Sequence, residues 1–209
     1  MVGHEAAGGR RPRRRLDAAA RRETILAAAV PAFAAAGYDQ TRVADIAAAV
    51  GVTEPVVFQN FGTKADLFIA VLDRVSERTA ARLGALAGRA DDVPEVLSRL
   101  LAAEHLDRVH SRGALGVLFL EAAGQPEARI REAGQRASAR VAEAVAALLR
   151  RGQAGGSIRP DADPTTLAWL VLSLARAREF RRLHDAPSSP ALEEELLVAV
   201  LEVLRRRQA

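Results

Sequence analysis

The sequence predicts an all-α protein of about nine helices, and three observations support this prediction. Ala and Leu dominate the chain while aromatic residues make up only 4% of it, a composition that favours helices over sheets. Apolar residues recur three and four positions apart, whereas no segment shows the sustained apolar-polar alternation of a strand. Glycine and proline residues separate several of these periodic segments.

The first segment, residues 1–16, is rich in Gly and Arg and has almost no apolar content, which predicts a disordered N-terminal arm. The formal net charge of the chain is only +4, yet arginines crowd this arm and the start of the next segment. Clustered arginines attract phosphate groups. The alternative is a solvated tail that has no partner.

A first helix is predicted over residues 17–36. Its apolar positions recur with helical spacing and are Ile25, Leu26, Ala29, Val30 and Phe33. Gly37 is suited to end this helix, since glycine adopts the left-handed conformation that commonly follows a helix. Pro31 removes one hydrogen bond inside the helix, so we expect a kink there rather than a break.

Two short helices follow. One is predicted over residues 43–50, and Gly51 then permits a tight turn. Thr53 is a suitable N-cap for the second short helix, which ends near Phe61, and Pro55 lies in its first turn where it costs no hydrogen bond. This layout is a helix-turn-helix, whose second helix can enter the major groove of DNA.

Thr63 and Asp66 resemble a capping box and begin a long helix that extends to about residue 86. We therefore divide the chain into the arm, a helix-turn-helix domain over residues 17–64, and a larger helical domain over residues 65–209. The remaining helices are predicted over residues 94–110, 113–123, 126–151, 164–183 and 190–207.

The outer face of the second short helix is the candidate DNA-reading surface, and it consists of Glu54, Pro55, Val56, Phe58, Gln59 and Asn60. Gln and Asn can bond bidentately to adenine, while Val or Pro can contact a thymine methyl group. Glu54 either accepts a hydrogen bond from cytosine or complements the helix dipole, and Phe58 is as well suited to the core as to this face. Thr41, Arg42 and Lys64 are candidate phosphate contacts.

Other classes of function find little support in the sequence. The absence of cysteine excludes disulfides, thiolate metal sites and a cysteine nucleophile. The four histidines are scattered, and no phosphate-binding glycine loop is present, so we expect no enzyme activity, no cofactor and no metal. No apolar run is long enough to span a membrane and no secretory signal is evident, which favours a cytoplasmic protein.

Residues 22–72 resemble the DNA-binding domain of the TetR family of bacterial transcriptional regulators. The positions that carry the resemblance are Ile25, Ala29, Phe33, Gly37, Tyr38, Thr41, Ile46, Ala47, Gly51, Val52, Phe58, Phe61, Lys64 and Leu67. The run over residues 156–164 also resembles the family's usual entry to its eighth helix. Phe58 stands where the family usually has Tyr, and Asn60 where His is frequent, so two usual DNA contacts are altered.

The resemblance implies a homodimer that binds a palindromic operator on double-stranded DNA, usually as a repressor, and releases it when a small-molecule effector enters the C-terminal domain. It places Thr53 as the cap of the recognition helix and Lys64 against a phosphate. Two alternatives remain. One is a DNA-binding regulator without a small-molecule inducer, and the other is a non-specific architectural binder that relies on the arginine-rich arm.

Two further sets of residues follow from the pattern of the larger domain. Apolar stripes on the last two helices are candidates for a four-helix dimer interface and consist of Leu167, Leu170, Val171, Leu174, Leu192, Leu196, Ala199, Val200 and Val203. The alternative is that both stripes serve the core of a single chain. Polar residues that interrupt apolar faces are candidates for a ligand pocket: Glu104, His105, Arg108, Trp169, Arg176 and Arg178.

Overall fold

The computed structural model describes residues 18–88, 92–102, 115–183 and 189–205. These residues form helices and no strand, which confirms the predicted fold class. The helices are α1 (Ala18–Gln40), α2 (Val43–Ala49), α3 (Glu54–Phe61), α4 (Lys64–Ala87), α5 (Val93–Leu101), α7 (Leu115–Gly124), α8 (Ala128–Ala154), α9 (Pro164–Leu183) and α10 (Pro190–Leu204).

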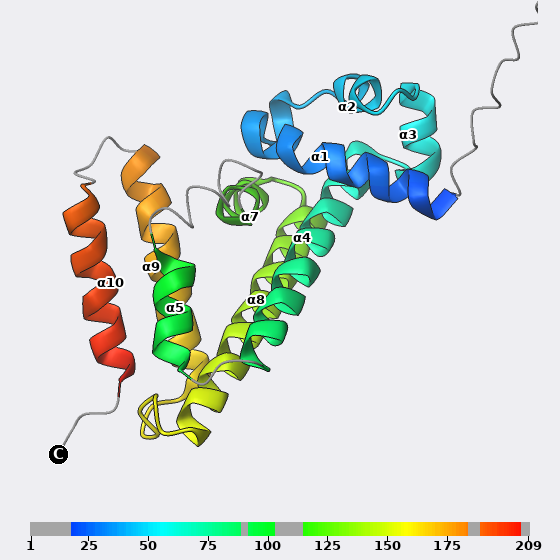
Figure 1. The fold of residues 1–209 in the computed structure, drawn as a ribbon. Helices are drawn as coiled ribbons and strands as arrows, with labels where there is room; N and C mark the ends of the chain where they lie inside the picture. Colours follow the sequence, from blue (N-terminus) through cyan, green and yellow to red (C-terminus); the bar gives the residue numbers. More distant parts are fainter. Residues whose placement is uncertain (1–17, 89–91, 103–114, 184–188, 206–209) are drawn as a thin grey trace, which may run out of the picture.

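The helices form two groups that a pair of long helices connects (Figure 1). Helices α1, α2 and α3 lie at one end, and α4 runs from them alongside α8. Helices α5, α9 and α10 pack at the far side of α8, while α7 lies between α1 and α9 and contacts both. Helix α7 therefore touches the first group of helices as well as the second.

The first group is held together by a densely packed aromatic cluster. Phe33 and Phe68 are completely buried, and their ring centroids lie 4.9 Å apart. The ring of Tyr38 lies 5.2 Å from that of Phe68, which joins the end of α1 to α4. Burial raises the pKa of the Tyr38 phenol, so this group stays neutral.

The interruption of α1 lies at Gly37 and not at Pro31, where a kink was expected. Gly37 has φ 74° and ψ 175°, a conformation that is essentially restricted to glycine, and Pro31 lies within the helical run before it. One more helical turn follows Gly37 and ends at Gln40. The predicted end of the helix proper was thus correct, but the extra turn was not foreseen.

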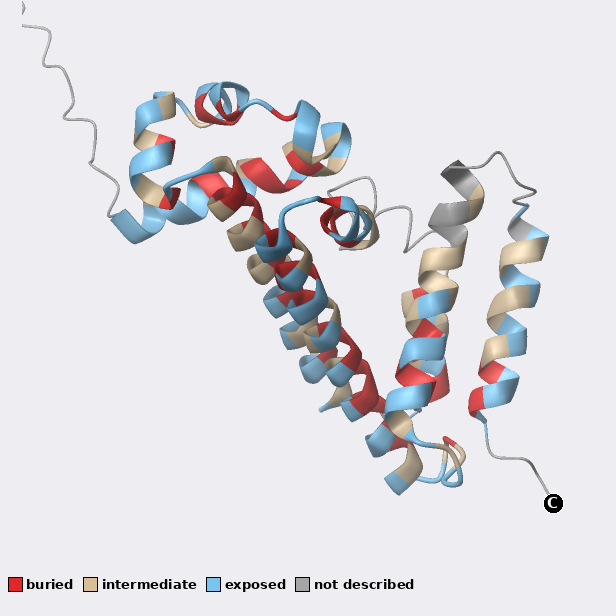
Figure 2. Cartoon of the chain, turned by 180° about the vertical axis from the view of Figure 1, so that it is seen from behind, coloured by how far each residue is buried: buried red, intermediate tan, exposed pale blue. Residues whose placement is uncertain are grey.

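The long pair α4 and α8 has its buried residues along the seam between the two helices (Figure 2). The capping box predicted for Thr63 and Asp66 is present at the start of α4. Arg140 of α8 donates to the hydroxyl of the buried Ser76 of α4 at 2.6 Å. At Gly134 a side chain would bring a Cβ within 2.8 Å of the Cβ of Ala122, so this glycine lets α7 pack closely on α8.

The remaining helices largely follow the expected ranges. Helix α5 ends at Leu101, because Ala102 leaves the helical conformation, and the rest of the predicted 94–110 segment lies outside the described residues. The predicted arm over residues 1–16 also lies outside them. Within the described ranges, no helix is long and apolar enough to cross a lipid bilayer.

Candidate functional site

The helix-turn-helix is built from two short helices, of which α2 packs on α1 and α3 packs on α2 and α4. Ile46 of α2 and Val57 of α3 are each 1% exposed and join the core that α1 and α4 provide. Gly51 makes the turn with φ 70°, and the N–H of Val52 donates to the carbonyl of Ala47 at 3.0 Å. This packing fixes which face of α3 points away from the protein.

That outward face carries most of the predicted reading residues. Pro55, Phe58 and Gln59 are exposed, while Glu54 and Val56 are half-buried. Phe58 is 38% exposed, so it lies on the outer face of α3 rather than in the core. An apolar ring beside an amide side chain suits contact with a thymine methyl group and an adenine edge.

Asn60 has local partners that limit its role as a reader. Its side-chain amide donates to the carbonyl of Val56 at 2.7 Å, and its own carbonyl accepts from the guanidinium of Arg22 at 2.5 Å. The same guanidinium lies 4.1 Å from the centroid of the Phe61 ring. Arg22 thus holds the end of α3 against α1, a positioning role that its place in an arginine-rich segment did not reveal.

The expectation that the Thr41 side chain meets a phosphate is wrong. Thr41 is only 5% exposed, and its hydroxyl donates to the carbonyls of Gly37 at 2.6 Å and Ala32 at 3.2 Å. The hydroxyl satisfies carbonyls at the interrupted end of α1, so it is not available to DNA. Thr53 does occupy the N-cap of α3, although its side chain makes no capping hydrogen bond.

The two cationic candidates lie at the surface but already have partners. Arg42 forms an ion pair with Asp45 at 2.8 Å, and this carboxylate raises the pKa of the guanidinium. The ammonium of Lys64 donates to the carbonyl of Asp39 at 3.0 Å and lies 4.9 Å from the Tyr38 ring centroid. Since an ammonium has three protons, Lys64 retains donors for a phosphate.

A carboxylate of α7 connects this part of the molecule to the rest. Glu121 accepts from the backbone N–H of Tyr38 at 2.8 Å and from the amide of Gln125 at 3.1 Å. A Cβ at Gly37 would lie only 3.2 Å from the same carboxylate. Farther along the chain, Arg129 pairs with Asp66 of the α4 capping box at 2.6 Å. Both contacts tie the α7–α8 region to the base of the helix-turn-helix.

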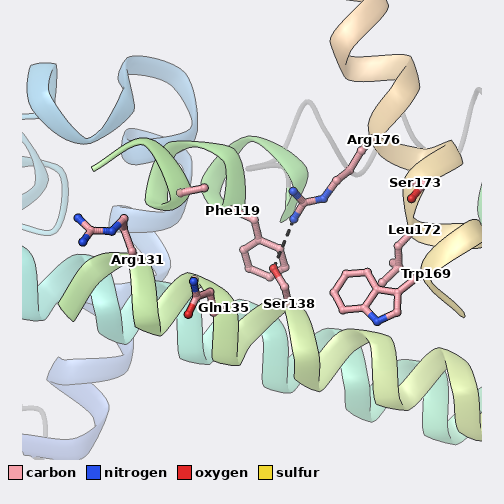
Figure 3. Close-up of a pocket in the computed structure, with 10 residues that line it drawn as sticks. Phe119, Arg131, Gln135, Ser138, Trp169, Leu172, Ser173 and Arg176 are labelled. Atoms are coloured by element: carbon pink, nitrogen blue, oxygen red, sulfur yellow. Dashed lines mark hydrogen bonds between the residues drawn. The ribbon is translucent and has the colours of Figure 1, made fainter. Parts of the chain in front are cut away.

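A cavity of about 430 Å³ opens between α7, α8 and α9 (Figure 3). Apolar side chains of Phe119, Trp169 and Leu172 line it together with the hydroxyls of Ser138 and Ser173. The guanidinium of Arg176 reaches over Phe119 towards Ser138, whereas Arg131 extends away from this group (Figure 3). The cavity has the apolar walls and few polar groups of a small-molecule site.

The structure brings together only part of the predicted pocket. Trp169 and Arg176 line the cavity, while the side chain of Arg178 is not among those that the structure describes. Glu104, His105 and Arg108 lie outside the described residues. Phe119, Ser138 and Leu172 were not predicted, because no local signal in the sequence shows that α7, α8 and α9 enclose a space.

The predicted dimer stripes divide into two groups. Leu167 and Val171 are 4% and 3% exposed within a single chain, which corrects their assignment: they belong to the core of the chain itself. Leu170 and Val203 are exposed, as is Ala199, and each is free to contact a second chain. The half-buried members are Leu174, Leu192, Leu196 and Val200.

The fold and this surface define a class of protein: a helix-turn-helix DNA-binding protein with a separate helical domain. The family model of the tetR family of bacterial regulatory proteins matches residues 25–71. A second model, described as the C-terminal domain of SbtR-like transcriptional regulators, matches residues 102–206, half of the chain. The chain therefore belongs to the TetR family and is a DNA-binding transcriptional regulator.

Individual relatives agree with this assignment. Over 68 residues the chain is 41% identical to the HTH-type transcriptional activator FasR of Mycolicibacterium smegmatis, an alignment that covers 32% of this chain and only 31% of FasR. A TetR-family regulator from Rhodococcus sp. superimposes with a TM-score of 0.72 at 26% identity, covering 88% of this chain and 98% of that one. The regulator FadR of Bacillus subtilis, solved with stearoyl-CoA, shares the fold with a TM-score of 0.68 at 19% identity, covering 88% and 99%.

Proposed function

We propose that this regulator acts as a homodimer that binds a palindromic operator and represses transcription until a small molecule enters the cavity. The observation that carries the proposal is the outward face of α3, where Pro55, Phe58 and Gln59 are exposed while Val57 anchors the helix. A palindromic operator presents two half-sites about 34 Å apart, so two such helices are needed. A single chain carries one such helix, so we expect a second copy of the chain to contact the other half-site.

The exposed apolar residues of α9 and α10 support the dimer. Val198 is 48% exposed on α10, and Leu170 of α9 and Val203 of α10 are exposed as well. Large apolar side chains at this density on two packed helices favour burial against another surface. In a symmetric dimer the same helices of a second chain supply that surface.

The cavity and its contacts support control by a small molecule. Helix α7 contributes Phe119 to the cavity, and two residues later Glu121 holds the N–H of Tyr38 at the end of α1. A ligand that shifts α7 therefore acts on the base of the helix-turn-helix and on the spacing of the two reading helices. FadR, which shares the fold, was solved in complex with stearoyl-CoA, and this supports a small-molecule ligand for the present regulator.

Activation is a second candidate function, because FasR is described as an activator. Selection and sequencing of bound genomic fragments supplies the operator, and a reporter with this operator at its promoter then gives the sign of regulation. Repression predicts a higher reporter signal when the gene for this protein is deleted, whereas activation predicts a lower one. If the selection yields a single preferred palindrome, the protein is a sequence-specific regulator, whether repressor or activator, and not an architectural DNA binder.

The reading face is tested by Gln59→Ala, with Arg99→Ala as a control on the exposed surface of α5. We expect Gln59→Ala to lower affinity for the selected operator by more than about 10-fold and to relax the base preference, because each half-site loses one bidentate contact worth about 1–3 kcal/mol. Arg99→Ala should leave both unchanged. An unaltered consensus in the Gln59 variant, measured by repeating the selection, contradicts the assigned reading face.

A further inference from the structure

The charge inside the cavity identifies the kind of ligand that it takes. Among the described side chains that line it, Arg131 and Arg176 are cationic and none is acidic. The guanidinium of Arg131 donates hydrogen bonds to the backbone carbonyls of Gln125 and Pro126. Of these two described arginines, Arg176 is therefore the one whose guanidinium faces the cavity (Figure 3).

Arg176 has no carboxylate to balance it within the residues that the structure describes. Its contacts are a long hydrogen bond to the hydroxyl of Ser138, at 3.4 Å, and the ring of Phe119, whose centroid lies 5.7 Å from the guanidinium carbon. Burial lowers the pKa of this guanidinium, because desolvation disfavours its charged form.

Arg181, five residues farther along α9, shows the contrasting arrangement. Its guanidinium binds both carboxylate oxygens of Glu193, at 2.7 and 2.8 Å, and the two side chains are 16% and 12% exposed. A partly buried cation is ordinarily paired in this way. Arg176 lies on the same helix and has no such partner among the described side chains, which leaves its charge available to an anionic ligand.

We propose that the ligand of this cavity is an anionic amphiphile whose carboxylate or phosphate binds Arg176 and Ser138 and whose apolar part lies against Phe119, Trp169 and Leu172. An arginine fork matches a carboxylate or phosphate bidentately, and the hydroxyl of Ser138 adds a donor. The apolar walls provide the surface against which the rest of the ligand packs. This assignment rests on the proposed role of the cavity as the effector site.

Trp169 is the single tryptophan of the chain and lines the cavity, so its fluorescence reports binding. The full-length protein is titrated with octanoate, with octanol as the neutral analogue and with octylamine as the cationic one. Octanoate is expected to bind at least 10-fold more tightly than either. Octanoyl-CoA distinguishes a phosphate from a carboxylate as the anionic group of the ligand, since its acyl carbonyl is neutral and its phosphates are anionic.

Arg176→Gln tests whether Arg176 binds the anion. Arg176→Lys retains the charge, and Arg136→Gln is a matched control on the exposed face of α8. Arg176→Gln should weaken binding of the tightest anion about 10-fold or more and leave octanol unchanged. Arg176→Lys should recover part of the loss, and Arg136→Gln should have no effect. Thermal unfolding of each variant verifies that it is folded.

Equal binding of octanol and the anions to the wild-type protein overturns the proposal, as does an unchanged anion affinity in Arg176→Gln. Operator affinity is measured separately, with and without the anion. If the anion binds through Arg176 but operator affinity does not change, the ligand class stands and the proposed control of DNA binding fails. If a neutral ligand releases the operator while the Arg176 variants behave as the wild type, the proposed control of DNA binding stands and the anionic ligand class fails.

Discussion

The interior around α1 and α4 and the space between α7, α8 and α9 are packed differently. Around α1 and α4, the rings of Phe33, Tyr38 and Phe68 fill the interior, and Phe33 and Phe68 are fully buried. Between α7, α8 and α9, a cavity of about 430 Å³ remains, and Trp169 at its wall is 44% exposed. The DNA-binding end is filled by its own side chains, whereas the other end retains a cavity and exposed apolar side chains.

This difference has a physical consequence for what each end tolerates. Removing a side chain from a filled interior loses the free energy of its transfer from water and also leaves a cavity. Such an interior therefore tolerates truncation poorly. A lining residue of an open cavity has fewer contacts to lose. We therefore expect mutations to affect stability at the DNA-binding end and ligand response at the cavity.

The largest effect is expected from Phe68→Ala. Removal of this fully buried ring should lower the free energy of unfolding by about 3–5 kcal/mol, as for other buried aromatic residues. Leu172→Ala, at the cavity wall, is the comparison and should cost about 1 kcal/mol, because Leu172 is half-buried. Urea unfolding of both variants measures the difference, and equal losses would show that the two interiors are packed alike.

A smaller effect is expected from Gly37→Ala, with Gly51→Ala as the matched control. Both glycines have positive φ, 74° and 70°, but a Cβ at Gly37 also crowds Glu121 at 3.2 Å while a Cβ at Gly51 meets open space. We expect a loss of about 3 kcal/mol at Gly37 and about 1 kcal/mol at Gly51. If thermal unfolding shows the two variants to be equally stable, the contact between α7 and the end of α1 does not constrain this position.

The smallest effect concerns the α4 capping box. Hydrogen bonds from Thr63, followed by the pairing with Arg129, hold the pKa of Asp66 below its ordinary value of 3.8. The carboxylate therefore contributes stability above that pH, and the contribution is lost as the pH falls through the lower pKa of the folded state. Asp66→Asn should cost about 1 kcal/mol at pH 7, a typical value for a helix cap, and less at pH 3.

Urea midpoints at the two pH values test this prediction. Asp45→Asn serves as the control, because its fully exposed pair with Arg42 is screened by water and should change the midpoint less at pH 7. A loss from Asp66→Asn that is the same at pH 3 as at pH 7 would exclude the ionised carboxylate as the source of the stability.

The sequence predicted those features that depend on neighbours along the chain. The periodicity of Ile25, Ala29 and Phe33 located α1, and the spacing of Thr63 and Asp66 located the start of α4. The outward position of Gln59 followed from the same helical spacing. These features share one cause, which is that the period of a helix determines which side chains lie on the same face.

Features that depend on contacts between distant segments were not predicted. Thr41 is buried because the chain makes one more turn after Gly37 and returns its hydroxyl to the carbonyls there. The cavity arises where Phe119, Ser138 and Arg176 meet from three helices, and no spacing in the sequence indicates that meeting. Leu167 and Val171 belong to an apolar stripe whose pattern is the same for a core and for an interface.

The contact between Gly37 and Glu121 limits how this regulator can be recombined with its relatives. A chimera that carries another regulator's DNA-reading segment must bring a residue without a side chain at position 37, or the carboxylate at position 121 is displaced from the N–H of residue 38. A chimera that joins α7–α10 of this chain to another regulator's DNA-reading segment can be spliced within α4, after Tyr38, provided that position 37 is glycine. Compatibility between the two parts is therefore decided at position 37 as well as within the helix-turn-helix.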